Sequence, residues 1–295
     1  FSGHVKSRVY VGSQFVHQSD DGGQSWQIIS PDMPLNRKDH QESSGGIAID
    51  NLMTFDGSTL FAVEESPIEP GVIWVGSNDG QVNITRNGGN SWTNITSNFE
   101  NLPEWGTVAN IEPSKYKRGK AYVTIDLHQM GDFGTYVFMT EDYGQTWTKI
   151  SNTIPQSVHG FAHCVREDKI KEGVLYLGVD NGIYISTNDG ANWFRMKNNL
   201  PPAPVYWIDH QDRFDELVVG TYGRGYYIFD NISVVRDYAE NVTDEHYLFP
   251  QREAYRFNSR QAIKTDGPSL NSGTNPGYGA DINYFLTDSL PAHII

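Results

Sequence analysis

The chain has 295 residues, of which 20% are charged and 13% aromatic, and its formal net charge at pH 7 is −14. This balance is typical of a globular β protein, and the negative charge offers no basic face for the phosphates of DNA or RNA. No apolar run reaches the roughly 18 to 20 residues that a membrane-spanning helix needs, and the single cysteine, Cys164, excludes an intrachain disulfide. We therefore expect a folded all-β protein that binds no nucleic acid and is not an integral membrane segment.

An eight-residue motif recurs four times along the chain. Its form is Ser/Thr, any residue, Asp/Asn, any residue, Gly, any residue, Ser/Thr/Asn, Trp. The four copies are SDDGGQSW (19–26), TRNGGNSW (85–92), TEDYGQTW (140–147) and STNDGANW (186–193). A fixed motif at unequal spacing indicates one structural unit per repeat, with insertions in its loops.

Short β-branched and aromatic runs on both sides of the motifs predict strands. In chain order, an apolar run such as TVANIEPS (107–114) or VHGFAHCV (158–165) opens each later unit, and a pair of strands joined by a glycine turn follows, as in residues 72–85 and 174–186. The motif then turns the chain into one more strand, such as WTNIT or WTKIS. Four antiparallel strands per unit predict the blades of a β-propeller.

The two ends of the repeat differ from its middle. The first unit has three strand-like runs but no innermost strand, and the fifth has PVYWIDH, ELVVGT and GYYIF but neither a motif nor a fourth strand. Because a ring closed by its own ends does not normally leave both edges open, we expect about five blades that form the C-terminal part of a larger propeller. We expect this propeller in residues 1–232. Residues 233–295 should hold a linker, a polar loop and one alternating strand, ADINYFLTD (280–288).

The motif itself has a structural explanation. Its Asp or Asn side chain can accept backbone N–H groups across a turn, its Gly supplies a positive φ, and its hydroxyl groups close the turn. The Trp should pack between neighbouring blades, where its loss costs roughly 3 to 5 kcal/mol. We therefore expect all four Trp to be buried, and we assign structural roles to Asp21, Trp26, Asn87, Trp92, Asp142, Trp147, Asn188 and Trp193.

These motifs resemble the Asp-box, or bacterial neuraminidase repeat, of sialidases, sortilin-type propellers and xyloglucan-hydrolysing propellers. The longer runs at 60–96, 102–114 and 215–232 resemble one set in particular. These are large exported bacterial proteins with a sortilin-like propeller, often labelled glycosyl hydrolase. The resemblance implies an exported protein, either periplasmic, outer-membrane associated or secreted. It also implies that a β-sandwich follows the propeller and that ADINYFLTD is its first strand.

The loops between the second and third strands of each blade predict a ligand-binding face, which we call the working surface. In a four-stranded meander these loops lie on the face opposite to the motifs, and they carry seven candidate ligand-binding residues: Asp79, Asp126, His128, Asp132, Asp180, Tyr222 and Arg224. Asp79-Gly80, and Asn181-Gly182 next to Asp180, also fit ordinary hairpin turns, and Arg224 could bind a carboxylate or serve the structure of the ring. The loop IDLHQMGDFG (125–134) is longer than a turn requires, so its three candidates are the best functional ones.

Other chemical signatures are missing from the sequence. It has no phosphate-binding glycine loop, no Gly-x-Ser-x-Gly elbow and no paired metal-binding Cys. His159 and His163 are four residues apart next to a strand. In that setting a packed or exposed histidine is a simpler interpretation than a metal ligand. We predict neither a metal nor a cofactor.

Three functions remain open, in this order. The first is a binding module for a protein, peptide or glycan, and the second is a structural role beside the rest of the propeller or other subunits of an envelope assembly. The third is a glycoside hydrolase, which needs two facing carboxylates about 5 to 5.5 Å or roughly 6.5 to 9.5 Å apart. We expect no such pair among Asp79, Asp126, Asp132 and Asp180. A sialidase is disfavoured because Arg224 is the only arginine that we can place on the working surface.

Overall fold

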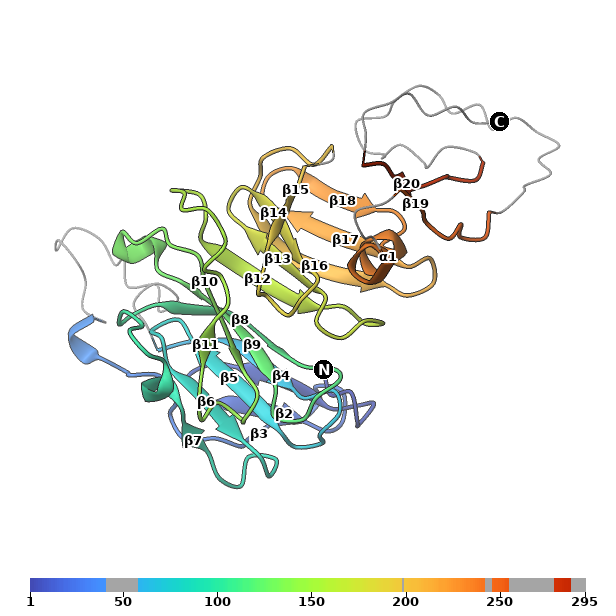
Figure 1. Cartoon of the computed structure of the whole chain (residues 1–295). Helices are drawn as coiled ribbons and strands as arrows, with labels where there is room; N and C mark the ends of the chain where they lie inside the picture. The colour runs from blue at the N-terminus through green and yellow to red at the C-terminus, as the bar shows by residue number, and fades with distance from the viewer. Residues whose placement is uncertain (41–57, 198, 242–245, 255–278, 288–295) are drawn as a thin grey trace. The chain divides into compact units, whose positions relative to one another are not determined.

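The computed structural model describes residues 1–40, 58–197, 199–241, 246–254 and 279–287 (Figure 1). The chain forms two compact units, one of residues 1–209 and 218–227 and the other of residues 210–217 and 228–295. Most of the regular structure in the described residues is β-strand. The other regular elements there are the helix α1 (Ser233–Asn241) and the short 3-10 turns η1 (Lys38–His40), η2 (Thr96–Asn98) and η3 (His128–Met130).

Three four-stranded sheets form the centre of the repeat within the described residues. Each is an antiparallel meander whose strands follow one another in chain order. They are β4 (Leu60–Glu65), β5 (Ile73–Ser77), β6 (Val82–Thr85) and β7 (Thr93–Asn94); β8 (Thr107–Pro113), β9 (Ala121–Asp126), β10 (Tyr136–Thr140) and β11 (Thr148–Lys149); and β12 (Ala162–Glu167), β13 (Leu175–Val179), β14 (Gly182–Ser186) and β15 (Phe194–Met196). The prediction of four-stranded blades is confirmed.

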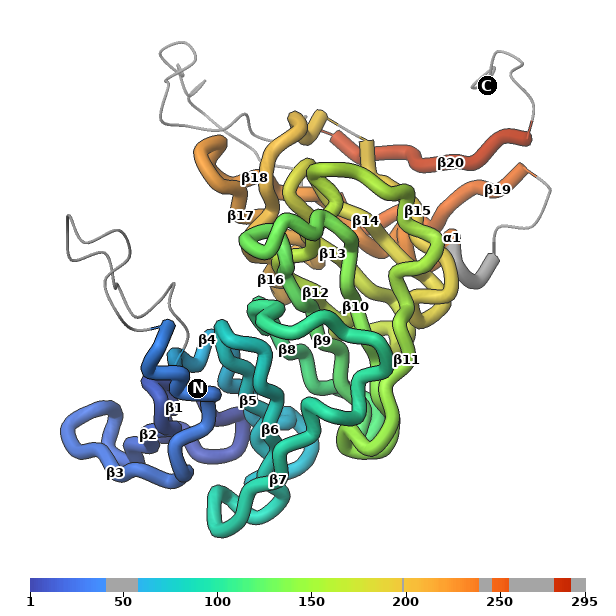
Figure 2. The backbone as a smooth tube through the Cα atoms, turned by 90° about the vertical axis from the view of Figure 1, so that its left-hand side faces the viewer, coloured from blue at the N-terminus to red at the C-terminus, as the bar shows by residue number. Residues whose placement is uncertain are grey.

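Sheets of three strands stand before and after these blades. The first holds β1 (Val9–Gly12), β2 (Val16–Ser19) and β3 (Gln27–Ile28), and the fifth holds β16 (Val205–Gln211), β17 (Glu216–Thr221) and β18 (Gly225–Phe229). We number the five sheets as blades 1 to 5. The innermost strands of blades 2, 3 and 4, which are β4, β8 and β12, lie side by side (Figure 2).

The hydrophobic core lies between the blades rather than inside one of them. Trp74 of blade 2 belongs to the same buried cluster as Ile125 and Trp147 of blade 3. Tyr122 of blade 3 shares a second cluster with Leu175 of blade 4. Since a sheet with two apolar faces must cover both of them, each central blade is held by its two neighbours.

The recurring motifs form turns between the third and fourth strands. In blade 3, the Oδ1 atom of Asp142 accepts hydrogen bonds from Thr140 Oγ1 at 2.8 Å and from the Thr146 N–H at 2.9 Å, and the Gly144 N–H donates to Thr140 Oγ1 at 3.0 Å. The same three contacts recur around Asp21, Asn87 and Asn188. Every polar group named here is engaged in shaping the turn.

The glycine of each later motif receives an isoleucine from the preceding blade. A Cβ atom on Gly144 would lie 2.4 Å from Ile95 Cδ1, and one on Gly190 would lie 2.6 Å from Ile150 Cδ1. A Cβ atom on Gly89 would lie 2.6 Å from the carbonyl oxygen of Ile29 and 3.3 Å from its Cδ1. Each of these isoleucines stands three residues after the Trp of the motif before it. The glycine therefore provides close contact between blades as well as a positive φ.

The expectation that all four Trp are buried is wrong for Trp26. Trp147 and Trp193 are 8% and 6% exposed and Trp92 is partly buried, but Trp26 is 44% exposed. The indole N–H groups of Trp92 and Trp193 donate to the carbonyls of Ile29 and Ile150 in the preceding blade. The indole of Trp26 donates instead to Gly23 in its own turn. The Trp becomes buried only where another blade covers it, and no blade precedes blade 1 in the described residues.

The part of the chain after residue 232 differs from expectation in two respects. The helix α1 stands where the sequence analysis placed a linker. Of ADINYFLTD, only β20 (Tyr284–Phe285) is a strand, and it pairs with β19 (Tyr247–Leu248). The predicted polar loop lies outside the described residues apart from Gly279. Arg236 on α1 anchors the helix within its unit, since its Nη1 donates to Asp215 Oδ2 at 2.6 Å.

Candidate functional site

The loops between the second and third strands come together with the starts of the innermost strands. The Asp180 N–H, after β13, donates to the carbonyl of Phe161 just before β12 at 3.2 Å. The Tyr222 N–H, after β17, donates to the carbonyl of Pro204 just before β16 at 2.9 Å. Two segments that are distant in the sequence thus reach one edge of each blade. We call this edge the rim.

Blade 3 contributes an Asp–His pair to the rim. The Nδ1 atom of His128, in η3, lies 2.8 Å from both carboxylate oxygens of Asp126, and the His128 backbone N–H donates to Asp126 Oδ1 at 2.9 Å. The imidazole also stacks on the ring of Phe161 in blade 4, with 4.7 Å between the ring centres. A ring nitrogen held by a carboxylate carries a proton, so Nε2 is the ring nitrogen left for another partner.

A second carboxylate, Asp180 of blade 4, lies between two histidines. His159 Nδ1 is 3.0 Å from Asp180 Oδ2, and His163 Nε2 is 3.5 Å from Asp180 Oδ1. The second distance is too long for a good hydrogen bond, and His163 Nε2 is buried without a hydrogen-bond partner in the described residues. Burial lowers the pKa of His163, although the charges of Asp126 and Asp180 oppose this effect. His163 is therefore neutral at pH 7.

Two tyrosines of blade 5 complete the group. Tyr206, at the start of β16, stacks on His163 with ring centres 4.0 Å apart, and Tyr222 lies 5.8 Å from Tyr206. They are 50% and 74% exposed. Burial raises the pKa of Tyr206, and the charges of Asp126 and Asp180 raise it further. Both carboxylates thus act on the same phenol.

These side chains come from three blades and meet at one place. We call them the rim cluster, and its members are Asp126, His128, His159, Phe161, His163, Asp180, Tyr206 and Tyr222. Four of the seven candidates from the sequence belong to it. The other three, Asp79, Asp132 and Arg224, lie elsewhere.

Asp79 does not face solvent, which contradicts its nomination as a ligand-binding residue. It is 1% exposed, and its carboxylate accepts hydrogen bonds from Ser77 Oγ, from the Leu35 N–H at 2.9 Å and from the Ser58 N–H at 3.2 Å. Three donors around one buried carboxylate hold loops of the first two blades together. Asp79 is a structural residue here.

Asp132 and Arg224 are near the predicted surface but make no contact with the rim cluster that the structure records. Asp132 accepts from Tyr136 OH at 2.6 Å and from the Gly134 N–H at 2.8 Å, and so shapes its own loop. Arg224 is exposed at the tip of the β17–β18 turn, between two glycines with φ values of 80° and 72°. The long loop 125–134 thus contributes His128 to the rim cluster beside Asp126, and Asp132 has a local role.

Four members of the rim cluster were missed as site residues. His159, Phe161 and His163 stand in HGFAH at the start of an innermost strand, and Tyr206 stands in the same place one blade later. The sequence analysis placed only the loops between second and third strands on the working surface. The starts of the innermost strands lie on the same edge of the blades, and this geometric relation could have identified all four.

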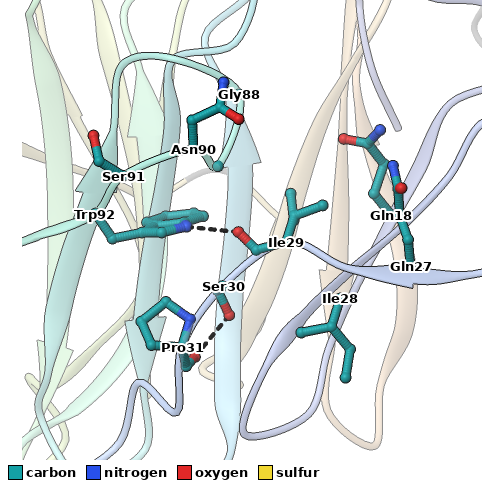
Figure 3. Close-up of a pocket in the computed structure, with 11 residues that line it drawn as sticks. Gln18, Gln27, Ile28, Ile29, Ser30, Pro31, Gly88, Asn90, Ser91 and Trp92 are labelled. Carbon is teal, nitrogen blue, oxygen red and sulfur yellow. Dashed lines mark hydrogen bonds between the residues drawn. The ribbon is translucent and has the colours of Figure 1, made fainter.

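An open hollow of about 570 Å³ lies between blade 1 and the motif turn of blade 2 (Figure 3), and none of its lining residues belongs to the rim cluster. Trp92 forms part of its wall, and the Trp92 indole donates to the Ile29 carbonyl at 2.8 Å. Its lining has amide, hydroxyl and backbone groups but no acid, imidazole or amine. The hollow therefore has no group for acid–base chemistry.

The innermost strands carry a second set of charges, largely paired. Glu112 of β8 accepts from Arg166 Nη1 of β12 at 3.2 Å and also from Lys115 Nζ. The Arg166 guanidinium lies 4.1 Å from the ring centre of Trp207. Burial raises the pKa of Glu64 on β4, and the nearby Arg166 charge opposes this. Burial thus favours the neutral form of Glu64 more than solvent exposure would.

Metal binding and membrane insertion find no support in the part of the chain that is described. There, no group of three or more His, Cys, Asp or Glu side chains is arranged to hold a metal ion. No described helix has the length and apolar character that crossing a bilayer requires.

No family model and no curated protein matches the chain. Solved structures do. A GH74 xyloglucanase from Xanthomonas campestris superposes with a TM-score of 0.56 and 16% identity, over 78% of this chain and 35% of that one. An ancestral GH74 enzyme gives 0.52 and 18%, over 78% and 30%. The extracellular domain of a protein described as a hybrid two-component system from B. thetaiotaomicron gives 0.51 and 16%, over 84% and 30%.

The chain spans about a third of the length of these solved structures. At 16 to 18% identity, such similarity establishes the architecture and not the activity. The four-stranded meanders and these comparisons together identify the fold as a β-propeller.

Proposed function

We propose that the chain is a binding module of the propeller type, with the rim cluster as its binding surface for a peptide, protein or glycan. The observation that carries this proposal is the convergence of exposed tyrosine faces and carboxylates from three blades. Binding sites combine apolar and aromatic contact area with a few polar groups that fix orientation. Tyr206 and Tyr222 supply the first of these, and Asp126 and Asp180 supply the second.

Binding is favoured over hydrolysis because the rim carboxylates are already engaged. Asp126 is held by His128, and Asp180 is held by His159. A glycosidase acid must keep its proton at the working pH, and its partner must face it across an open groove. Asp79 and Asp132 are occupied by hydrogen bonds in their own loops. No two of these four carboxylates are thus available as the pair that a glycosidase needs.

A hydrolase is the second candidate, on one specific observation. Glu64 has a raised pKa and lies within electrostatic reach of a second carboxylate, Glu112. The GH74 xyloglucanases share the fold but show nothing of the activity of this chain. Reducing-sugar release from xyloglucan that disappears in both Glu64→Gln and Glu112→Gln would move hydrolysis to first place.

We also propose where the chain acts and which domain follows the propeller. Residues 1–232 would be the propeller part of an exported protein and one component of an envelope assembly, and residues 233–295 would be a linker that includes α1, followed by the first strand of a β-sandwich. The motif resemblance supports export. The fold of the bacterial extracellular domain described above is compatible with it.

A binding screen against peptide and glycan arrays tests the proposed function. We expect Tyr222→Ala to abolish the signal that the unchanged protein gives. Tyr226→Ala is the matched control, because Tyr226 is an exposed tyrosine on β18 outside the rim cluster. A signal that is equal in all three proteins would place the binding surface elsewhere.

A further inference from the structure

The rim cluster has negative charge that no described cation balances. The ion pairs of Asp126 and Asp180 within the described residues are with imidazoles only. Arg195 lies close by, but its Nη2 donates to the Asn181 carbonyl at 2.7 Å. His163 is neutral at pH 7 because burial lowers its pKa. Two carboxylates therefore face the rim without a lysine or arginine as partner.

One buried atom in the cluster lacks a hydrogen bond. His163 is 6% exposed, and its Nε2 atom has no hydrogen-bond partner among the described residues. The nearest charged atom is Asp180 Oδ1 at 3.5 Å. A buried polar atom without a partner is costly, and native proteins seldom leave one. A ligand at the rim therefore meets the partly exposed Asp180 carboxylate beside this nitrogen, and not the buried nitrogen itself.

Aromatic faces stand beside these acceptors. Tyr206 has one face covered by His163, with ring planes 20° apart, and remains half exposed. Tyr222 is more exposed still, and its ring is tilted by 43° to that of Tyr206. Cations are attracted to the faces of aromatic rings, and a planar guanidinium can stack on them. Carboxylates within the same group add charge-assisted hydrogen bonds.

We propose that the rim cluster binds a cationic side chain of a basic peptide segment, and arginine in preference to lysine. The guanidinium donates to Asp180, and its plane stacks on Tyr206 with Tyr222 beside it. The charge of Asp126 adds to the attraction. This inference rests on the proposed function and names its ligand class. A neutral glycan could stack on the same rings, but it would leave the charge of the two carboxylates unbalanced.

The test compares three small probes on the purified 295-residue chain by fluorescence anisotropy. They are a labelled glycine-serine peptide with three arginines, the same peptide with citrulline in their place, and a labelled neutral oligosaccharide. Citrulline keeps the planar shape of arginine but carries no charge. We expect the arginine peptide to bind at least about tenfold more tightly than the citrulline peptide, and to weaken as salt rises from about 0.05 M to about 0.5 M.

Variants separate the rim from the general acidity of the chain. Asp180→Asn and Asp126→Asn should each weaken the arginine peptide by about tenfold or more. Glu141→Gln removes the same charge at the motif end of blade 3, where Glu141 pairs with Lys117, and should leave the affinity unchanged. Circular dichroism confirms that each variant is folded.

The outcomes are distinguishable. Oligosaccharide binding that requires Tyr222, or equal affinity for the arginine and citrulline peptides, would overturn the cationic ligand and leave the binding function standing. An equal loss of arginine-peptide affinity in Glu141→Gln and Asp180→Asn would reduce the effect to net charge and overturn the inference. Absence of any rim-dependent binding by all three probes, together with an empty array screen, would count against the inference and the proposed function alike.

Discussion

The two ends of each blade use polar residues in opposite ways. At the motif end, Asp142 is surrounded by donors from its own turn, and Gly144, two residues later, packs against Ile95 of the preceding blade. At the rim, Tyr222 is largely exposed, and Asp126 and Asp180 form ion pairs with imidazoles only among the described residues. Polar groups that bond within their own turn specify the structure, whereas exposed ones are available to a ligand. The repeated motif is therefore scaffolding, and the non-repeated rim is where we look for function.

Trp193→Ala should produce the largest loss of stability. The indole is buried between blades 3 and 4 and donates to the Ile150 carbonyl at 2.7 Å, so its removal leaves a cavity and an unpaired carbonyl. We expect a loss of about 3 to 5 kcal/mol in the free energy of unfolding. The measurement is the midpoint of urea denaturation, followed by far-UV circular dichroism.

Trp26→Ala is the internal control for that experiment, since the same residue of the same motif is exposed in blade 1. We expect its cost to remain below about 1 kcal/mol. Equal losses at Trp26 and Trp193 would show that the Trp acts within its own turn, and the explanation by contact between blades would fail.

Gly190→Ala should have the next largest effect. The new Cβ atom would lie 2.6 Å from Ile150 Cδ1, and the backbone has a φ of 83°, which side-chain-bearing residues seldom adopt. We expect a loss of about 1 to 3 kcal/mol from overpacking and strain together. The midpoint of urea denaturation reports it.

Gly22→Ala separates the two causes. Gly22 has a similar φ of 73°, but no atom lies within 4 Å of the position of its Cβ. It therefore carries the backbone strain without the clash. If both alanines cost the same, the isoleucine contact contributes nothing, and the proposed fit between successive blades is incorrect.

The repeat made the scaffold predictable from the sequence. The site was hard to predict because its residues do not recur from blade to blade. Four copies of one motif with a terminal Trp indicate blades because each copy occupies the same place in a meander. The exposure of Trp26 could not be read from its motif, since burial depends on the neighbouring blade. Likewise, His163 and Tyr206 meet only because two innermost strands lie side by side in a particular register. Sequence spacing within one blade contains no information on that register.

The pH dependence of stability offers a smaller test at the rim. Because burial holds the pKa of His163 below the ordinary value of 6.5, the unfolded chain takes up a proton first as the pH falls through that value. His163 therefore lowers the stability of the folded state on the acid side, and stability rises again towards pH 7.

Glu64 and Glu167 have raised pKa values, so their effect on the pH dependence has the opposite sign to that of His163. Their contribution to the stability of the fold falls as the pH rises above the ordinary pKa of glutamate. Comparing His163→Gln with the unchanged chain cancels their contribution. We expect the urea midpoint of the variant to fall less between pH 7 and pH 5 than that of the unchanged chain. Parallel curves for the two proteins would mean that His163 gains its proton as easily in the fold as in the unfolded chain.

Tyr222→Ala should have the smallest effect on stability, and this completes the contrast between the two ends. The side chain is 74% exposed, and its ring contact with Tyr206 is a loose one of 5.8 Å. We expect the free energy of unfolding to stay within about 0.5 kcal/mol of the unchanged chain, while binding at the rim is lost. Urea denaturation and anisotropy titration of the same preparation measure both quantities. A variant that loses several times this stability would place Tyr222 among the structural residues, and its loss of binding could then no longer be attributed to a missing ligand contact.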